Sequence, residues 1–319
     1  MEKKEMTSNK TSQLLLIKFP IIFPIFYGLT LYYFPNYEKE LILITILLLA
    51  ETHFGATWPF FLNKVNHQYL QEKKLNLIYI PVLIVALCII GYVYFRNLFL
   101  LIFFAANVYH VTRQSWGICK LYCKDENEFK FQSNFIYLIN FLLFSVALFR
   151  FYAPIIKTEH LLFLNLIFGA IILSVSIFYI LKYRFSENYL TFLTGSLIFY
   201  PACFVNNPVH VILMGVTMHF TQYLYLTNFV SKSRASELDI EERKDKNYFF
   251  SFFIIILIYS SIMTLFSSSG GTKGILFKDL ILIPIIGQML HFYIDSQVWK
   301  FSEKNNRDNV LRHLKKIIN

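Results

Sequence analysis

Four histidines in this chain lie inside long apolar segments, where an ionisable side chain is costly and marks a candidate functional site. These are His53, His110, His219 and His291, in the segments ETHFGATWPFF (51–61), NVYHVTRQSWG (107–117), MHFTQYLYL (218–226) and QMLHFYIDSQVWK (288–300). Imidazole is a ligand of iron, copper or zinc rather than of calcium or magnesium. Four imidazoles brought together would therefore form a site for iron, copper or zinc. Of these metals, Fe(II) would fit best if the site were that of an oxygenase.

Polar side chains follow these histidines at helical spacing. Three or four positions after a histidine stand Arg113, Gln114, Gln222, Tyr223 and Asp295. Residues three or four apart share one face of a helix, and lipid cannot satisfy a polar face, so we expect these faces to point inward. A metal-bound imidazole usually gives its second N–H to a carboxylate, a carbonyl or water. Gln114, Gln222 and Asp295 are candidates for that role, and Asp295 could instead bind the metal or pair with Arg113.

The elements that carry these residues are predicted to be membrane helices. The composition is 56% hydrophobic and 16% charged, with a mean hydropathy of +0.49, whereas about 25% charged residues is usual for soluble domains. A helix crosses a bilayer with about 20 apolar residues. The predicted spans are 13–35, 41–63, 76–96, 98–119, 133–152, 160–182, 188–205, 208–230, 248–267 and 276–299.

The fold class predicted from this pattern is an all-α, polytopic bundle of ten transmembrane helices. We expect a tail over 1–12, one transmembrane domain over 13–300 with a polar loop at 231–247, and a basic tail over 301–319. Lys and Arg total 22 on the side of the two termini and six on the other side. Because basic loops stay in the cytosol, both termini are predicted to be cytosolic, in a bacterial inner membrane.

The predicted orientation places the four histidines at similar depths. Each precedes the next cytosolic basic residue by nine to thirteen positions, which is roughly 14–20 Å of helix. The matched depth favours one metal site. Two other interpretations stay open: hydrogen bonding between helices by structural histidines, as in an assembly or lipid-binding protein, and a proton or ion pathway through the histidines and Asp295, as in a transporter.

The remaining ionisable and thiol groups carry weaker predictions. His210 is interpreted as structural, and Glu51 as a partner for a neighbouring helix. His67, His160 and His313 are expected in solvent. Cys119 and Cys123 are expected to be reduced thiols on the cytosolic side. The net charge of +10 lies in loops between apolar runs, so the expected partners are membrane lipids and not nucleic acid.

Three segments resemble motifs of the Brp/Blh family of bacterial and archaeal membrane-embedded carotene dioxygenases. THFGAT (52–57) is similar to that family's histidine–phenylalanine–glycine segment, YHVTRQSW (109–116) to its histidine–x–x–arginine segment, and LHFYID (290–295) to its last motif. Those enzymes hold one iron with histidines from several spans and cleave β-carotene to retinal. The resemblance implies His53, His110 and His291 as ligands, with Asp295 in support. The class it favours is a membrane metal oxygenase acting on a lipid-soluble substrate with O₂.

Overall fold

A computed structural model describes residues 10–62, 66–237, 248–269 and 278–318. Every regular element among these residues is a helix and none is a strand, which confirms the predicted all-α class. Contacts divide the chain into two compact units. Among the described residues, unit 1 comprises those within Leu43–Ala106 and Tyr223–Asn319, and unit 2 comprises those within Asn9–Ile42 and Asn107–Gln222. We describe each unit by itself.

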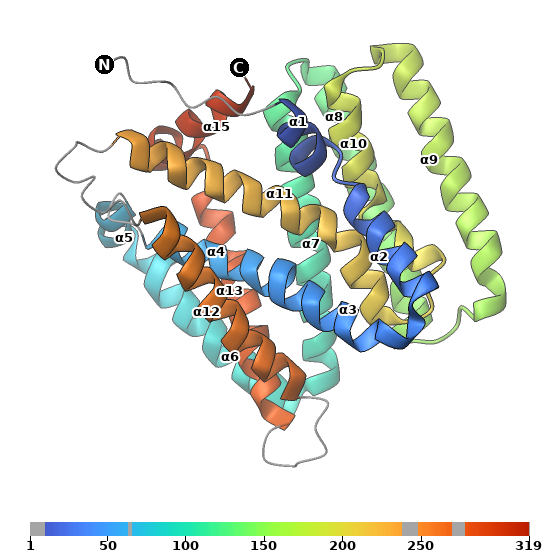
Figure 1. Cartoon of the computed structure of the whole chain (residues 1–319), viewed down its shortest axis with the longest axis horizontal. Helices are drawn as coiled ribbons and strands as arrows, with labels where there is room; N and C mark the ends of the chain where they lie inside the picture. The colour runs from blue at the N-terminus through green and yellow to red at the C-terminus, as the bar shows by residue number, and fades with distance from the viewer. Residues whose placement is uncertain (1–9, 63–65, 238–247, 270–277, 319) are drawn as a thin grey trace. The chain divides into compact units, whose positions relative to one another are not determined.

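Unit 1 is built around two long helices near the C-terminal end of the chain. Its elements are the π-helical turns η3 (Ile46–Ala50), η5 (Leu75–Tyr79) and η11 (Arg307–Leu311), the 3₁₀ turn η10 (Lys278–Ile281), and the helices α4 (Glu51–Phe61), α5 (His67–Glu72), α6 (Ile80–Tyr94), α12 (Tyr248–Ser269), α13 (Leu282–Val298), α14 (Lys304–Asn306) and α15 (Arg312–Ile318). Helix α4 packs against α12 and α13, and α13 also packs against α6 (Figure 1).

Two glycines explain how closely these helices approach one another. A Cβ atom at Gly55 of α4 would lie 2.7 Å from Cδ1 of Tyr259 on α12. A Cβ atom at Gly287 of α13 would lie 2.8 Å from the hydroxyl oxygen of the same tyrosine. Tyr259 therefore packs on the bare backbone of both α4 and α13, the two helices that carry His53 and His291.

Unit 2 also contains long apolar helices. Its elements are α1 (Lys10–Gln13), the π-helical turn η1 (Leu14–Lys18), α2 (Ile22–Tyr33), the 3₁₀ turn η2 (Pro35–Tyr37), α8 (Glu126–Ala147) with its π-helical extension η6 (Leu148–Tyr152), the 3₁₀ turn η7 (Thr158–His160), α9 (Leu161–Tyr183), α10 (Glu187–Leu197) and the 3₁₀ turn η8 (Tyr200–Cys203). Three helices have residues in both units: α3 (Glu38–Thr45), α7 (Arg96–Tyr122) and α11 (Pro208–Glu237).

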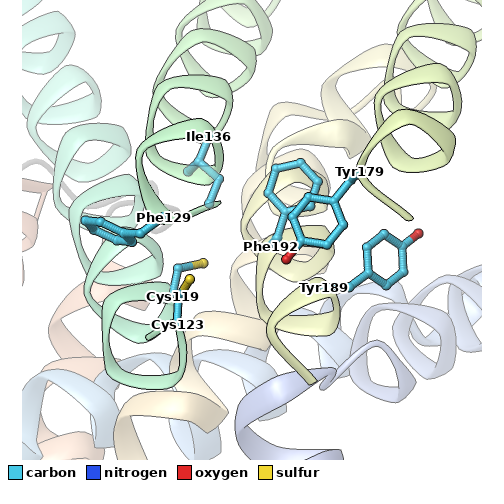
Figure 2. Packing of buried hydrophobic residues seen from close by; sticks show 7 residues of the cluster. All are labelled: Cys119, Cys123, Phe129, Ile136, Tyr179, Tyr189 and Phe192. Carbon is cyan, nitrogen blue, oxygen red and sulfur yellow. The ribbon is translucent and has the colours of Figure 1, made fainter. Parts of the chain in front are cut away.

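An aromatic cluster forms the core of unit 2 where α7, α8, α9 and α10 meet. Figure 2 shows the rings of Tyr179 and Phe192 stacked, with centroids 5.1 Å apart. The thiols of Cys119 and Cys123 lie near Phe129 in the same cluster. Both cysteines are free and buried, as are the chain's other two.

Among the described residues, four helical stretches are long and apolar enough to cross a membrane: Pro35–Phe61, Leu75–Tyr94, Glu126–Tyr152 and Thr158–Tyr183. A fifth is obtained if Lys10–Lys18 and Ile22–Tyr33, bent by 61°, are counted as one span. These stretches fall on five of the ten predicted spans and support association with a membrane. Helices α7 and α11, which carry the polar histidine segments, are not among them.

Prolines interrupt two of the predicted spans. The bend in the first span falls at Phe19–Ile21, where Pro20 removes a backbone N–H and disfavours helix at the residue before it. The predicted span 188–205 consists of α10 followed by the short turn η8, which contains Pro201.

Candidate functional site

Unit 1 places two of the four histidines side by side. His53 on α4 and His291 on α13 are fully buried, and their ring centroids lie 4.5 Å apart at an interplanar angle of 66°. Tyr223, which lies at the point where α11 enters unit 1, packs its ring 4.3 Å from that of His53. The close packing of α4 and α13 therefore brings together groups that are 238 positions apart in sequence.

A hydrogen-bonded network fixes the His291 ring. Oγ1 of Thr57 lies 2.6 Å from His291 Nδ1 and 2.8 Å from the Tyr223 hydroxyl oxygen. The Tyr223 hydroxyl donates to Asp295 Oδ1 at 2.7 Å, and Thr57 donates to the same oxygen at 3.3 Å. A hydroxyl has a single proton, so if Thr57 donates to Asp295, its oxygen must accept a hydrogen bond from the Nδ1–H of His291. This leaves His291 Nε2 as the ligand atom of the ring.

The helix period explains why these side chains converge. Thr57 follows His53 by four residues on α4, and Asp295 follows His291 by four residues on α13, so each pair shares one helix face. Asp295 Oδ2 lies 3.8 Å from His291 Nε2, and both residues are buried. Asp295 therefore has one oxygen on the hydroxyl network and the other near Nε2 of His291.

Unit 2 holds the other two histidines as a second buried pair. His110 on α7 and His219 on α11 have ring centroids 5.5 Å apart, with nearly perpendicular planes. Their exposed fractions are 7% and 1%. The buried Gln222, one turn beyond His219, donates its amide to the backbone carbonyl of Ile17 at 2.6 Å. One amide N–H of Gln222 thus ties α11 to η1.

Arg113 lies in different surroundings from the histidine before it. Its side chain is exposed, with the guanidinium 3.9 Å from the ring of Trp116 and donating to the Tyr137 hydroxyl at 3.5 Å. A long arginine side chain can direct its charge outward while its stem stays on the helix. The expected inward-facing stripe therefore holds for His110 but not for Arg113. Gln114 is half-buried.

The buried histidine and aspartate groups of the chain could bind a metal ion. In unit 1 these groups are His53, His291 and Asp295, and in unit 2 they are His110 and His219. Neutral imidazole and carboxylate are ligands that several transition metals accept, so the donor types do not select one metal.

The other candidates from the sequence have defined surroundings. Glu51 accepts a hydrogen bond from Gln288 on the neighbouring helix α13 at 3.3 Å. His210 is buried between the Tyr27 hydroxyl, 2.7 Å from Nδ1, and the Glu38 carboxylate, 2.8 Å from Nε2. Two protein groups thus engage both ring nitrogens of His210, which agrees with its interpretation as structural.

One prediction about the peripheral histidines is wrong. His67 and His160 are exposed as expected, but His313 is only 1% exposed. It lies on α15, where its Nδ1 is 2.9 Å from the Ser233 hydroxyl of α11. Burial lowers the pKa of His313 to about 4. The basic residues of the tail predict a solvated segment, whereas the buried Leu314 and Ile317 anchor α15 in unit 1.

Thr57 is the site residue that sequence reasoning missed. It belongs to the segment 51–61 that drew attention to His53, and its position one turn after that histidine was the available signal. A threonine in an apolar run is not by itself a sign of function, because its hydroxyl can donate a hydrogen bond to a backbone carbonyl of its own helix.

No protein-family model, curated protein or solved structure matches the chain.

Proposed function

We propose that the protein is an integral membrane oxidoreductase that uses a histidine-bound metal, as an oxygenase does. The observation that carries the proposal is that all four histidines singled out by sequence are buried, and that each packs against another of the four within its unit. Ordinary core histidines have no reason to occur as two such pairs on four different helices.

The metal in this proposal is one Fe(II) ion bound by His53, His110, His219 and His291, with copper or zinc as the alternatives. A bound iron would supply the activation of O₂ for oxidation of the substrate. The role of Thr57 is to hold the His291 ring, and Asp295 and Tyr223 provide a proton-exchanging pair beside it. The resemblance of three segments to the membrane-embedded carotene dioxygenases supports the same class.

The substrate in this proposal is a lipid-soluble molecule such as an isoprenoid or a fatty lipid. Helices such as Leu75–Tyr94 and Thr158–Tyr183 expose most of their apolar surface, as membrane helices do. A substrate would enter from the bilayer, in which O₂ also dissolves. We also propose that the chain crosses the membrane ten times, with both termini in the cytosol of a bacterial cell.

Metal analysis of the protein purified in mild detergent tests this function. We expect about one iron per chain, and we expect His110→Ala and His291→Ala to lose metal together with activity on extracted lipids. His160→Ala is the matched control, because that histidine is exposed. Protein that is folded but lacks stoichiometric iron, copper or zinc would contradict the proposal. Two metals per chain would show that the histidine pairs bind separate ions.

One observation favours a transporter as the second candidate. Thr57, Tyr223, Asp295 and His291 form a continuous buried hydrogen-bonded chain, which is a suitable path for protons. Substrate uptake into metal-free proteoliposomes, driven by a pH gradient and abolished by Asp295→Asn, would support this candidate against the oxidoreductase.

A further inference from the structure

A cleft of about 520 Å³ opens on unit 2 between the first turns of α8 and the last turn of α9. Lys130 and Lys182 line it from the two helices, together with the amides of Asn127 and Asn134 and the rings of Phe131 and Tyr183. None of these residues belongs to the histidine site. The cleft thus combines two cations, amide donors and apolar walls.

The two lysines of the cleft differ from Lys18 and Lys120 of the same unit. Lys120 pairs with Glu126 at 3.0 Å, and Lys18 pairs with Glu187. Within the described part of the chain, neither Lys130 nor Lys182 forms an ion pair with a carboxylate. The ammonium of Lys182 instead lies 5.1 Å from the centre of the Tyr183 ring.

The one acidic group that lines the cleft is already engaged. Oδ1 of Asp125 accepts a hydrogen bond from the backbone N–H of Glu128 at 2.7 Å and caps the start of α8. This role in capping directs its charge to the helix N-terminus. The charge of the cleft is therefore positive, and a ligand with negative charge would complement it.

The position of the cleft indicates which kind of negatively charged ligand reaches it. Lys130 and Lys182 stand at the ends of two stretches long and apolar enough to cross a membrane, Glu126–Tyr152 and Thr158–Tyr183. Apolar side chains next to the cleft on these helices are exposed, including Leu181 at 81% and Leu138 at 55%. Lysines at such a boundary meet lipid headgroups, and the exposed side chains beside them meet acyl chains.

We propose that this cleft binds the phosphate headgroup of an anionic phospholipid. Lys130 and Lys182 contact the phosphate from its two sides, and the amides of Asn127 and Asn134 donate hydrogen bonds to its oxygens. The acyl chains lie along the exposed faces of α8 and α9. The proposal goes beyond the oxidoreductase function and does not depend on it, because none of its residues lies in the histidine pairs.

Lipid binding by the detergent-purified protein tests the proposal, with native mass spectrometry as the readout. The probes are dioleoyl phosphatidylglycerol, dioleoyl phosphatidylcholine and inorganic phosphate. We expect phosphatidylglycerol to be retained in preference to phosphatidylcholine. The variant Lys130→Gln/Lys182→Gln should bind phosphatidylglycerol roughly 30-fold more weakly, since each lysine near an anionic surface contributes about a fivefold step.

The matched control is Lys39→Gln/Lys157→Gln, which removes the same charge from exposed lysines elsewhere in unit 2. Equal binding by the cleft variant and this control, or equal retention of the two lipids, would overturn the proposal. Inorganic phosphate that displaces phosphatidylglycerol at micromolar concentration would show a site for soluble phosphate compounds and would overturn the lipid assignment. The iron content of the cleft variant should equal that of the wild type, so this result is independent of the oxidoreductase proposal.

Discussion

Thr57 connects three of the groups around His53 and His291 through a single hydroxyl. It contacts His291 Nδ1, the Tyr223 hydroxyl and Asp295 Oδ1, and it is completely buried. Such a residue acts on a metal only through the ligand it orients, and is therefore a positioning residue. Its effect should appear first in metal affinity, because a loosely held imidazole binds metal less well.

Thr57→Val should weaken metal binding by roughly 10- to 100-fold, the usual range for loss of such a partner. Valine keeps the shape of threonine but leaves the His291 Nδ1–H and the Tyr223 hydroxyl without one partner each. That loss should also cost about 1–3 kcal/mol of stability. Competition with a chelator measures the metal affinity, and thermal unfolding in detergent measures the stability.

Thr52→Val is the control on the same helix. Its hydroxyl is buried too, but it bonds only to the Leu48 and Leu49 carbonyls of the preceding turn. We expect unchanged metal affinity for this variant. Equal losses in the two variants would mean that the Thr57 hydroxyl has no specific role at the site.

Residue types and spacing predicted the buried histidines but not the outward turn of Arg113. The four imidazoles are short and stay where their helix face points, so the period of 3.6 residues was sufficient. An arginine has four rotatable bonds, and Trp116 one turn further on offers it an aromatic surface at 3.9 Å. Helical spacing therefore predicts the direction of a short side chain such as that of histidine, but not that of a long, flexible side chain such as that of arginine.

At the scale of elements, Gly215 sets the path of α11 before His219. A Cβ atom there would lie 1.7 Å from the backbone carbonyl oxygen of Ile198. Gly215 precedes His219 by four residues and so lies on the same face of the helix. The absence of a side chain at this position lets the chain after α10 pass directly over α11.

Gly215→Ala should lower the unfolding temperature in detergent, because backbone atoms cannot move aside as a flexible side chain would. Overpacking of this kind typically costs about 1–3 kcal/mol. It should also displace His219 and reduce the metal content.

Gly117→Ala on α7 is the matched control, since a Cβ atom there meets nothing within 4 Å. Alanine is the better helix former by about 0.8–1.0 kcal/mol, so this variant should be as stable as the wild type or more stable. An unchanged Gly215→Ala protein would mean that α11 can shift at no cost.

Proline chemistry explains where the predicted elements and the observed ones differ. Hydropathy alone predicts one helix over 13–35, because Pro20 does not lower the mean apolar character of that run. The backbone nevertheless bends by 61° there, since Pro20 has no N–H to donate and restricts Phe19. The glycine contacts could not be predicted, because they depend on which helix lies opposite.

For the whole molecule, the sequence predicted an all-α protein because its apolar runs have the length of about 20 residues that a membrane helix needs. Five of the ten predicted spans coincide with stretches that are apolar enough to cross a membrane. The polar segments of α7 and α11 lower their hydropathy, so these two helices are not among those stretches. The division into two units had no signal in the sequence, which shows neither a linker nor a repeat.

The last prediction concerns the orientation of the entire chain. Single cysteines placed at Lys124 and at Lys157 report opposite ends of the stretch Glu126–Tyr152, and the four native cysteines are buried. With 22 basic residues predicted on one side and six on the other, a membrane-impermeant maleimide should label Lys157→Cys in intact cells. It should label Lys124→Cys, and cysteines added at either terminus, only after permeabilisation, because basic loops stay in the cytosol.

The wild-type protein provides the background for both conditions. Labelling of one terminus but not the other in intact cells would require an odd number of spans, and labelling of Lys124→Cys alone would invert the orientation.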